Sequence, residues 1–353
     1  MTREAATEAQ AREVLPAFGI TPATVGPLGH GLINDTFAVS GPDGDYVLQR
    51  VHPVFAPEIH LNIAAVTQHL VRKSMVTPRL VYSLDGSPWV ERGGKVWRLM
   101  TRMPGVSVDA ADDPAQAHAA ARLLGRFHSA LDDLEHEFVG LRANVHDTPT
   151  HLQRLRDAVE QHPGHRLFAQ VEPIAHQILR QAETLPPLAG ARTRIVHGDP
   201  KLNNVLFESD TGPGRRQAQC WIDLDTVAPM SLAVELGDAW RSWCNRSGED
   251  EAEARFDAEV FEASWRGYRA GCTLELDADE REGLLHGVEW ITLELAARFT
   301  ADALFENYFG WDSSRFASAG DHNLRRAQGQ WSLHHAVMKA RVERARILSA
   351  DGA

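Results

Sequence analysis

The sequence contains few cysteines and no arrangement of them that suggests cross-links or a zinc site. Its 353 residues include only Cys220, Cys244 and Cys272, which lie far apart and form no C-x-x-C pair. This excludes a disulfide framework and fits the reducing conditions of the cytosol. The histidines are scattered, and the zinc-protease pattern H-E-x-x-H does not occur. The chain therefore predicts neither a secreted disulfide scaffold nor a zinc enzyme.

Long apolar runs are missing as well. No stretch of about 18 apolar residues occurs, so we expect no membrane-spanning helix. The polar N-terminus lacks the apolar segment of a signal peptide. The formal net charge of −12 disfavours nucleic acid or an anionic membrane as a partner. We therefore expect a cytoplasmic protein that binds neither, and the sequence leaves its oligomeric state open.

The first hundred residues alternate between strand and helix patterns. Residues 36–39 and 46–48 are strand-like and flank a turn-rich segment, which is typical of a β-hairpin. Residues 57–73 carry apolar side chains at helical spacing. Two more strands are expected, around 79–83 and 96–100. A helix over the first twenty residues completes a small α+β unit.

Pro104 and Gly105 interrupt this pattern and predict a hinge. The rest of the chain is mostly helical, apart from strands within 194–226. Helices are expected over 114–132, twice within 150–185, and over 251–270, 279–305 and 323–348. Because 353 residues are too many for one compact core, we predict an α+β fold of two lobes. The small β-rich lobe comprises residues 1–103 and the larger helical lobe residues 104–353.

The most informative segment lies between the helices. Residues 195–207 carry H-G-D-x-x-x-x-N, with Asp199 and Asn204 five positions apart, and Asp223 ends the next apolar strand. Acidic residues and asparagine also favour plain turns. The two pieces in this order, each beside an apolar strand, instead indicate the catalytic loop and metal-binding aspartate of a kinase.

Phosphoryl transfer explains the residue types. It requires in-line geometry, metal ligands and neutralisation of charge rather than covalent chemistry by the protein. We predict that Asp199 is the catalytic base and that Lys201, two residues later, reaches the γ-phosphate. Asn204 and Asp223 offer hard oxygen ligands, which suit Mg²⁺. The expected cofactors are therefore ATP and Mg²⁺.

The lobes, the hinge and these motifs resemble the aminoglycoside phosphotransferase and choline kinase superfamily, which has a bilobal protein-kinase-like fold. Shorter segments are similar to bacterial N-acetylhexosamine 1-kinases, namely residues 29–37, 47–55, 199–207, 222–226, 237–241, 298–302 and 322–325. The resemblance implies ATP-dependent phosphorylation of the anomeric hydroxyl of a small-molecule sugar. It also implies that residues 1–103 bind the nucleotide and that Asp225 is an auxiliary acid near the substrate.

One strand departs from the pattern of the superfamily. The strand that should carry a phosphate-binding lysine reads Tyr46-Val-Leu-Gln-Arg50 and contains none. Arg50 could supply the charge, or Gln49 could occupy the position with the charge supplied from elsewhere. Because side chains alternate along a strand, only one of the two can point at the phosphates.

Other nucleotide contacts are expected on either side of this strand. Gly29 and Gly31 could offer backbone N–H groups to phosphate, or could simply form a turn. Thr101 and Met103, next to the hinge, complete the set of predicted nucleotide contacts.

Substrate contacts are expected from two places. His30, Asn34 and Asp35 in the first hairpin could face the substrate, or could be turn residues on a solvated loop. Arg298 continues an apolar helical stripe and needs a partner there. That partner is the substrate, Glu294 four residues earlier, or Asp302 one turn later.

Two further interpretations remain open. The enzyme could phosphorylate an aminoglycoside, choline or another hydroxyl compound instead of a sugar. The chain could also be an inactive kinase-fold protein that binds ligands, for which the missing strand lysine is the sole argument. The retained groups at Asp199, Asn204 and Asp223 argue against inactivity.

Overall fold

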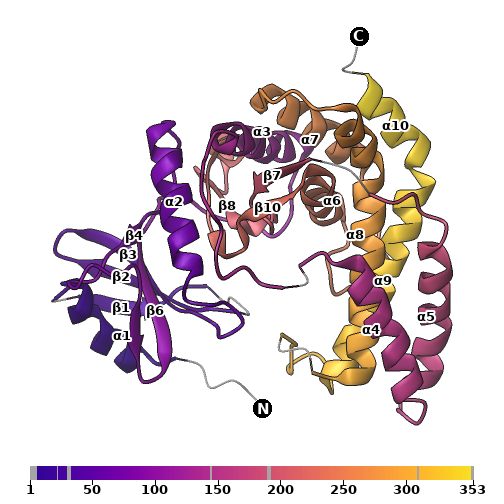
Figure 1. Ribbon diagram of the computed structural model, residues 1–353, viewed down its shortest axis with the longest axis horizontal. Coiled ribbons are helices and arrows are strands. Elements are labelled where there is room, and N and C mark those ends of the chain that lie inside the picture. The colour runs from indigo at the N-terminus through magenta and orange to yellow at the C-terminus, as the bar shows by residue number, and fades with distance from the viewer. Residues whose placement is uncertain are drawn as a thin grey trace.

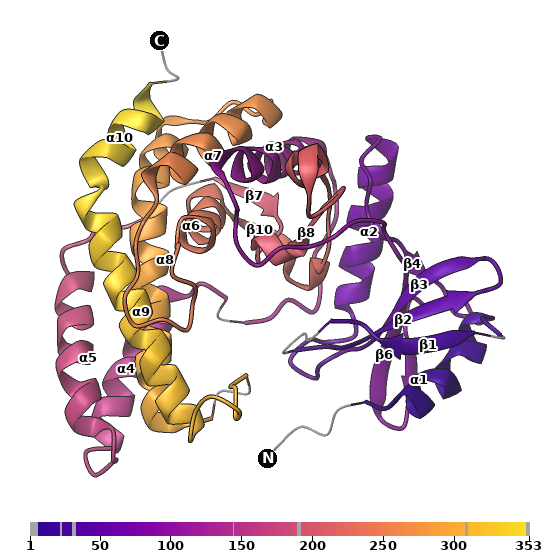
Figure 2. The same ribbon diagram turned by 180° about the vertical axis from the view of Figure 1, so that it is seen from behind.

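The computed structural model describes residues 6–21, 23–29, 33–143, 145–188, 192–307 and 310–350. A small lobe built on an antiparallel sheet stands beside a larger, mostly helical lobe (Figure 1). The predicted fold class is confirmed. The view from behind shows helix α2 between the sheet and the larger lobe (Figure 2). Within the described residues, every helix is too short or too polar to cross a bilayer.

The N-lobe combines one sheet with three helical segments. Its strands follow the order β1-β2-β3-β6-β4, with β5 paired to β6, and all pairs are antiparallel. The elements are α1 (Glu8–Val14), the 3-10 helix η1 (Leu15–Phe18), β1 (Thr24–Pro27), β2 (Asp35–Gly41), β3 (Gly44–Arg50), α2 (Ile59–Arg72), β4 (Leu80–Val81), β5 (Val90–Arg92) and β6 (Lys95–Thr101). The predicted hairpin is β2–β3, and its strands are longer than the sequence pattern indicated.

The two faces of this sheet are buried against different partners. Leu48 and Leu99 belong to a core formed with α1 and η1. Met100, one residue after Leu99, belongs instead to the core formed with α2 and the C-lobe. Because side chains alternate across a sheet, Gln49 and Arg98 also point to the face that α2 and the C-lobe cover. This alternation decides which polar residues of the N-lobe can reach the other lobe.

The predicted hinge at Pro104 and Gly105 is followed at once by backbone hydrogen bonds to the C-lobe. Gly105 has a φ of 126°, and a Cβ there would lie 2.6 Å from the carbonyl oxygen of Phe207. Val106 and Phe207 exchange two backbone hydrogen bonds, of 2.9 and 2.8 Å. Glycine is required at this close approach, and the chain joins the C-lobe from Val106 onward.

The C-lobe holds two short antiparallel ribbons among its helices, β7 with β10 and β8 with β9. Its elements are α3 (Pro114–Leu131), α4 (Thr148–Gln161), α5 (Phe168–Ala182), β7 (Thr193–Val196), η2 (Leu202–Asn204), β8 (Val205–Phe207), η3 (Gly212–Arg216), β9 (Ala218–Trp221), η4 (Leu224–Thr226), β10 (Ala228–Ser231), α6 (Leu232–Trp243), α7 (Ala258–Gly271), α8 (Ala278–Phe305), α9 (Ala319–Lys339) and α10 (Arg341–Ser349). The sequence analysis did not predict α6, which follows β10 directly.

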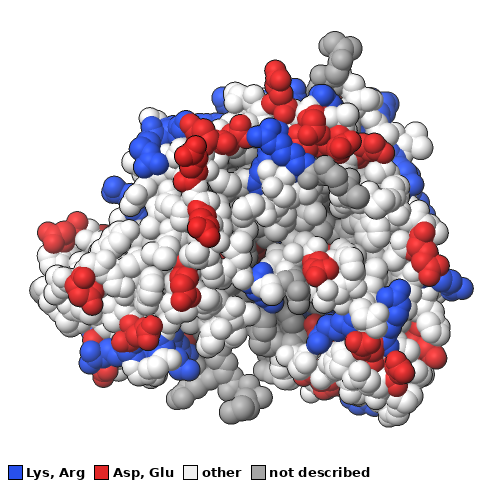
Figure 3. Space-filling model, in the orientation of Figure 1, with Lys and Arg blue, Asp and Glu red and all other residues white. Residues whose placement is uncertain are grey.

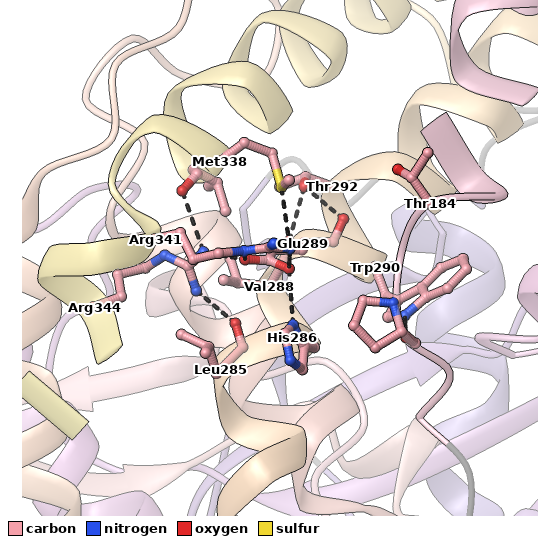
Figure 4. A network of polar contacts seen from close by, with 12 residues as sticks. Thr184, Leu285, His286, Val288, Glu289, Trp290, Thr292, Met338, Arg341 and Arg344 are labelled. Carbon is pink, nitrogen blue, oxygen red and sulfur yellow. Dashed lines mark hydrogen bonds and ion pairs between the residues drawn. The ribbon is translucent and has the colours of Figure 1, made fainter. Parts of the chain in front are cut away.

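The long helix α8 is tied to the C-terminal helices by one buried acid, Glu289. Its carboxylate accepts hydrogen bonds from Arg341 at 2.8 Å and Arg344 at 2.5 Å, and pairs with His286 at 3.0 Å (Figure 4). The side chains of Glu289 and Arg344 are fully buried. Burial alone would raise the pKa of Glu289, but the bonds from Arg341 and His286 and the bond and charge of Arg344 lower it to about 2. Glu289 is therefore ionised and holds α10 against the lobe.

Candidate active site between the lobes

The loop after β7 holds Asp199 beside Lys201 and Asn204. The Lys201 ammonium lies 3.0 Å from Asp199 Oδ1, and the Asn204 amide donates to the Asp199 carbonyl at 2.9 Å. Asp199 raises the pKa of Lys201, so the lysine is a cation at neutral pH. Both side chains of this pair remain partly exposed, at 39% for Lys201 and 29% for Asp199, so a ligand can reach them.

Glu235, near the start of α6, anchors the backbone of this loop. It accepts hydrogen bonds from the backbone N–H groups of His197 at 3.0 Å and Gly198 at 2.9 Å. Gly198 has a φ of 81°, and a Cβ there would lie 2.3 Å from the carbonyl oxygen of Thr226. The indole of Trp243 donates to the Pro200 carbonyl at 2.7 Å. These buried contacts fix the position of Asp199.

Asp223 lies across from this loop with a carboxylate that reaches the solvent. Among the described residues it has no hydrogen-bond or ion-pair partner, and its φ of 60° is left-handed. The surrounding protein and the like charge of Asp225 raise the pKa of Asp223. The Asn204 oxygen Oδ1 is likewise left without a partner in the part of the chain that is described, because only the amide nitrogen is bonded. Two side chains with oxygen atoms suited to a metal therefore have unused acceptors among the described residues.

The N-lobe meets this segment through Arg98 on β6. Arg98 pairs with Asp225 through Nη1, and its Nε donates to Gln49 Oε1 at 2.8 Å. Gln49 lies directly opposite Arg98 in the β3–β6 register. Burial alone would raise the pKa of Asp225, but Arg98 lowers it. A buried cation of the N-lobe is thus held two residues from Asp223.

Arg50, the other predicted phosphate cation, lies on the opposite face of the sheet. Its Nε donates to Asp35 Oδ2 at 2.7 Å, and the same carboxylate oxygen accepts from the backbone of Ala6, just before α1, at 3.2 Å. The structure therefore brings Gln49, and not Arg50 or Asp35, to the side that faces Asp225.

Asn34 is the predicted hairpin residue that reaches the C-lobe. Its amide donates to Asp225 Oδ2 at 2.8 Å, and its oxygen accepts from the backbone of His52 at 2.9 Å. Gly29 has a φ of 71° with open space around it. His30 and Gly31 lie outside the described residues.

The two predicted residues beside the hinge are half-buried. Thr101 ends β6, and its hydroxyl accepts from the backbone of Arg79 at 2.9 Å. Met103 approaches that hydroxyl with its sulfur, at 4.0 Å. The structure thus holds both at the entry to the linker between the lobes.

On the other side of Asp199, α6 contributes a buried ion pair. Arg241 Nε donates to Asp238 Oδ1 at 2.8 Å, and Arg241 Nη1 lies 3.5 Å from Glu249. Burial would raise the pKa of Asp238, but the charge of Arg241 and, to a smaller extent, those of His146 and Lys201 lower it. The loop after β7, α6 and the segment before α4 therefore lie close enough together for their charges to interact.

Helix α8 adds Glu294 and Arg298 to this neighbourhood. Glu294 is fully buried, accepts from Thr148 at 2.6 Å and pairs with His146 at 3.1 Å. Arg298 Nη1 lies 3.8 Å from Glu294, and the arginine side chain keeps 26% of its surface exposed. Asp302, one turn further on, pairs instead with Arg154 at 2.8 Å. Arg298 is therefore held loosely and remains accessible.

The face in Figure 3 is hollowed where the two lobes meet, and charges of both signs are mixed over the surface around it. Two other surface hollows, of about 420 and 410 Å³, lie around Leu274 of the C-lobe, and the first of them is also lined by Lys73 of the N-lobe. They share no residue with the groups described above. The cleft between the lobes is the place where the sequence motifs converge.

A family comparison agrees with this geometry. The model of the phosphotransferase enzyme family matches residues 24–270, which include the sheet, Asp199, Asn204, Asp223 and α6. The chain belongs to the phosphotransferase enzyme family. The predicted superfamily is thereby confirmed, and its resemblance to N-acetylhexosamine kinases in particular stays a prediction.

Individual relatives of this phosphotransferase are distant. A homoserine kinase of Cupriavidus necator is 28% identical over 204 residues, which span 57% of this chain and 57% of that protein. An aminoglycoside phosphotransferase of Alicyclobacillus acidocaldarius is 15% identical, with a TM-score of 0.61 and 98% of both chains covered. A spectinomycin phosphotransferase, solved with ADP and spectinomycin, is 12% identical, with a TM-score of 0.58 and coverage of 96% of this chain and 100% of that one. The two structures share the fold.

The donor set of this phosphotransferase suits magnesium bound together with a phosphate ligand. Nowhere among the described residues do three histidine, cysteine or acidic side chains converge as a complete metal site. Mg²⁺ is usually held by one or two protein oxygens, with phosphates and water completing its shell. Asp223 and the Asn204 oxygen fit that arrangement.

Sequence reasoning missed Arg98, Glu235 and His146. Arg98 and Glu235 interrupt apolar segments, Val-Trp-Arg-Leu-Met and Leu-Ala-Val-Glu-Leu. An isolated charge in such a segment is a signal, since it needs a partner when buried. No comparable signal marks His146, which lies in a loop with a φ of 52°.

Proposed function

We propose that this phosphotransferase is an ATP- and Mg²⁺-dependent kinase that phosphorylates a hydroxyl group of a small molecule. The observation that supports this most strongly is the hydrogen-bonded loop that holds Asp199 beside Lys201 and Asn204. The nearby carboxylate of Asp223 has no partner within the described part of the chain. Asp199 would accept the proton of the acceptor hydroxyl. Lys201 would stabilise the charge of the transferred phosphoryl group.

Asn204 Oδ1 and Asp223 would hold Mg²⁺ in this proposal. A metal held there would supply positive charge close to the phosphate groups of the nucleotide. The raised pKa of Asp223 supports this role, because a carboxylate that has lost part of its hydration and lies next to another acid is stabilised by a cation.

We propose a sugar as the acceptor, and an N-acetylhexosamine with its anomeric hydroxyl as the first candidate. The support is the charge balance beyond Asp199. Asp238 and Glu249 have Arg241 as a partner, and Glu294 has His146 and Arg298. Unpaired acidic side chains would favour binding of a cationic acceptor, such as a polycationic aminoglycoside or the monocation choline. Acidic side chains that are already paired suit a neutral polyhydroxyl compound.

A second candidate acceptor is homoserine. Arg298 is partly exposed and only loosely paired with Glu294, so its guanidinium is available to a carboxylate. The 28% identity to a homoserine kinase supports the same reading. This substrate would place its carboxylate at Arg298 and its hydroxyl at Asp199.

The test is an ADP-release assay with Mg²⁺-ATP and a panel of acceptors. The panel contains N-acetylglucosamine, N-acetylgalactosamine, homoserine, choline and kanamycin. We expect the highest kcat/KM for one of the two acetylated sugars. A clear preference for homoserine would replace the sugar assignment, and a preference for kanamycin or choline would refute the argument from charge balance. No turnover of ATP with any hydroxyl compound would overturn the proposal of kinase activity.

A further inference from the structure

The cation that β3 lacks is present on the neighbouring strand. Antiparallel pairing places Gln49 of β3 directly opposite Arg98 of β6, so both side chains project from the same face of the sheet. That face is the one covered by α2 and the C-lobe, since Met100 on the same side of β6 belongs to their shared core. The guanidinium therefore stands beside the position that a β3 lysine would occupy.

Arg98 is one of two buried arginines in the described N-lobe, and the other is Arg50. Arg50 pairs with Asp35 on the opposite face and cannot reach the cleft between the lobes. The lysines of that lobe, Lys73 and Lys95, are exposed, and Lys73 pairs with Asp133. Of the described N-lobe residues, Arg98 is thus the one buried cation directed toward Asp225.

The contacts of Arg98 hold it in place without using all of its donors. A guanidinium carries five N–H groups in a fixed fork. One donates to Gln49 and another to Asp225, and no further partner is found among the described residues. A buried arginine with such spare donors can bind phosphate oxygens while it stays paired with Asp225.

The two cations of the cleft come from different lobes. Arg98, from the N-lobe sheet, pairs with Asp225, two residues from Asp223. Lys201 belongs to the loop that leads to Asn204, whose backbone carbonyl accepts from Ile222, next to Asp223, at 2.9 Å. Both cations are therefore near the proposed metal ligands. Lys201 is paired with the proposed base Asp199, which places it at the transferred phosphoryl group and leaves the inner phosphates to Arg98.

The carboxylate that neutralises Arg98 comes from the C-lobe and not from helix α2 of the N-lobe. Glu58, at the start of α2, is exposed, and the hydrogen bonds of Arg98 go to Gln49 and Asp225 instead. The carboxylate that holds Arg98 comes instead from Asp225, 127 residues away in the other lobe. Arg98 and the metal-binding segment are thus positioned by each other.

We propose that Arg98 of β6 binds the phosphate groups of the nucleotide, in place of the lysine that β3 lacks, with Gln49 and Asp225 orienting its guanidinium. This inference rests on the proposed use of ATP. It makes Arg98 a nucleotide-binding residue and Asp225 a positioning residue rather than a contact of the acceptor.

The test compares ligands with and without phosphate on one set of variants of the full chain. Calorimetry with Mg²⁺ measures the Kd of ADP and of adenosine for the unmodified chain, Arg98→Met, Arg98→Lys and Arg50→Met. Arg50→Met is the matched control, because it also removes a buried arginine of the same sheet. We expect Arg98→Met to weaken ADP binding roughly 10- to 100-fold while adenosine binding is unchanged. Arg98→Lys should restore part of the ADP affinity, and Arg50→Met should alter neither Kd.

Three outcomes would overturn the inference. Unchanged ADP binding by Arg98→Met would exclude a phosphate contact. An equal loss of affinity for ADP and for adenosine would show that Arg98 only maintains the shape of the nucleotide pocket. If Arg98→Met fails to fold, the test uses Arg98→Lys instead. Weaker ADP binding by Arg98→Lys than by Arg50→Met, with adenosine binding unchanged, then supports the phosphate contact. In that case, an ADP affinity of Arg98→Lys equal to that of the control would overturn the inference. Absence of ADP binding by the unmodified chain would instead refute the proposed function itself.

Discussion

Two groups of buried charges in this protein contain the same residue types but differ in role. The first surrounds Asp225 in the cleft, where its partners Arg98 and Asn34 come from the other lobe. The second surrounds Glu289, whose partners Arg341 and Arg344 both belong to the C-terminal helix α10. Both acids are paired, and both have a pKa below the usual range.

The difference lies in what stands next to each pair. Beside Asp225, the carboxylate of Asp223 has no partner in the described chain and reaches the solvent. Around Glu289, helices close over the network, and the side chains of Glu289 and Arg344 have no exposed surface. A paired buried acid therefore indicates a ligand site only where unsatisfied groups face an open cleft beside it.

The largest effect on activity is expected from Asp199→Asn. A neutral amide cannot accept the hydroxyl proton, so kcat should fall by about 10²- to 10⁴-fold. Removing one charge from a partly exposed ion pair should leave the melting temperature nearly unchanged. Steady-state kinetics and a thermal melt measure both quantities, with Asp210→Asn in the exposed loop after β8 as control. A kcat close to that of the control would remove Asp199 from the role of base.

The largest effect on stability is expected from Glu289→Gln. This substitution leaves the buried guanidinium of Arg344 without its counter-charge, which typically costs about 3–5 kcal/mol of the free energy of unfolding. At temperatures where the variant stays folded, kcat/KM should match that of the unmodified chain. Denaturant unfolding provides the measurement. Arg341→Met is the matched control and should cost less, because Arg341 is 36% exposed and Glu289 keeps Arg344.

The Glu289 network also predicts how stability depends on pH. The folded pKa of about 2 lies below the ordinary value of 4.5, so the carboxylate contributes stability that is fully present above pH 4.5. That contribution is lost as the pH falls from 4.5 toward 2. The difference in unfolding free energy between the unmodified chain and Glu289→Gln should therefore narrow below pH 4.5. A constant difference between pH 7 and pH 3 would contradict the assigned ion pairs.

The smallest effect is expected from Arg298→Ala. Because Arg298 is loosely paired and partly exposed, its loss should cost under about 1 kcal/mol of stability. If its guanidinium binds the acceptor, the KM of that acceptor should rise about tenfold while the KM of ATP stays unchanged. Arg154→Ala, which removes a surface partner of the same helix α8, is the control. An unchanged acceptor KM would take Arg298 out of the acceptor site.

The sequence predicted the parts of the fold that local patterns encode. The hairpin, α2, α3 and the catalytic strands follow from turn residues and from the spacing of apolar side chains. Asp199, Asn204 and Asp223 could be located because they lie within one short segment with a recognisable spacing. The structure brings these three together in one cleft.

The features that the sequence did not predict depend on contacts between segments that are distant in the chain. The choice between Gln49 and Arg50 depends on which face of β3 meets the C-lobe, and strand alternation alone does not decide that. The pairing of Arg98 with Asp225 joins residues 127 positions apart. Local propensity carries no information about such a pair, since it arises only after both lobes have folded.

The packing around α2 joins the two lobes, so that they differ in architecture but do not fold as independent units. A single apolar core runs from Val51, Ile63 and Met100 of the N-lobe to Phe127 and Trp240 of the C-lobe. A chain cut after residue 103 would expose the N-lobe half of that core to water. The lobes should therefore melt in one cooperative transition, and neither is a module that could be transplanted intact into another protein.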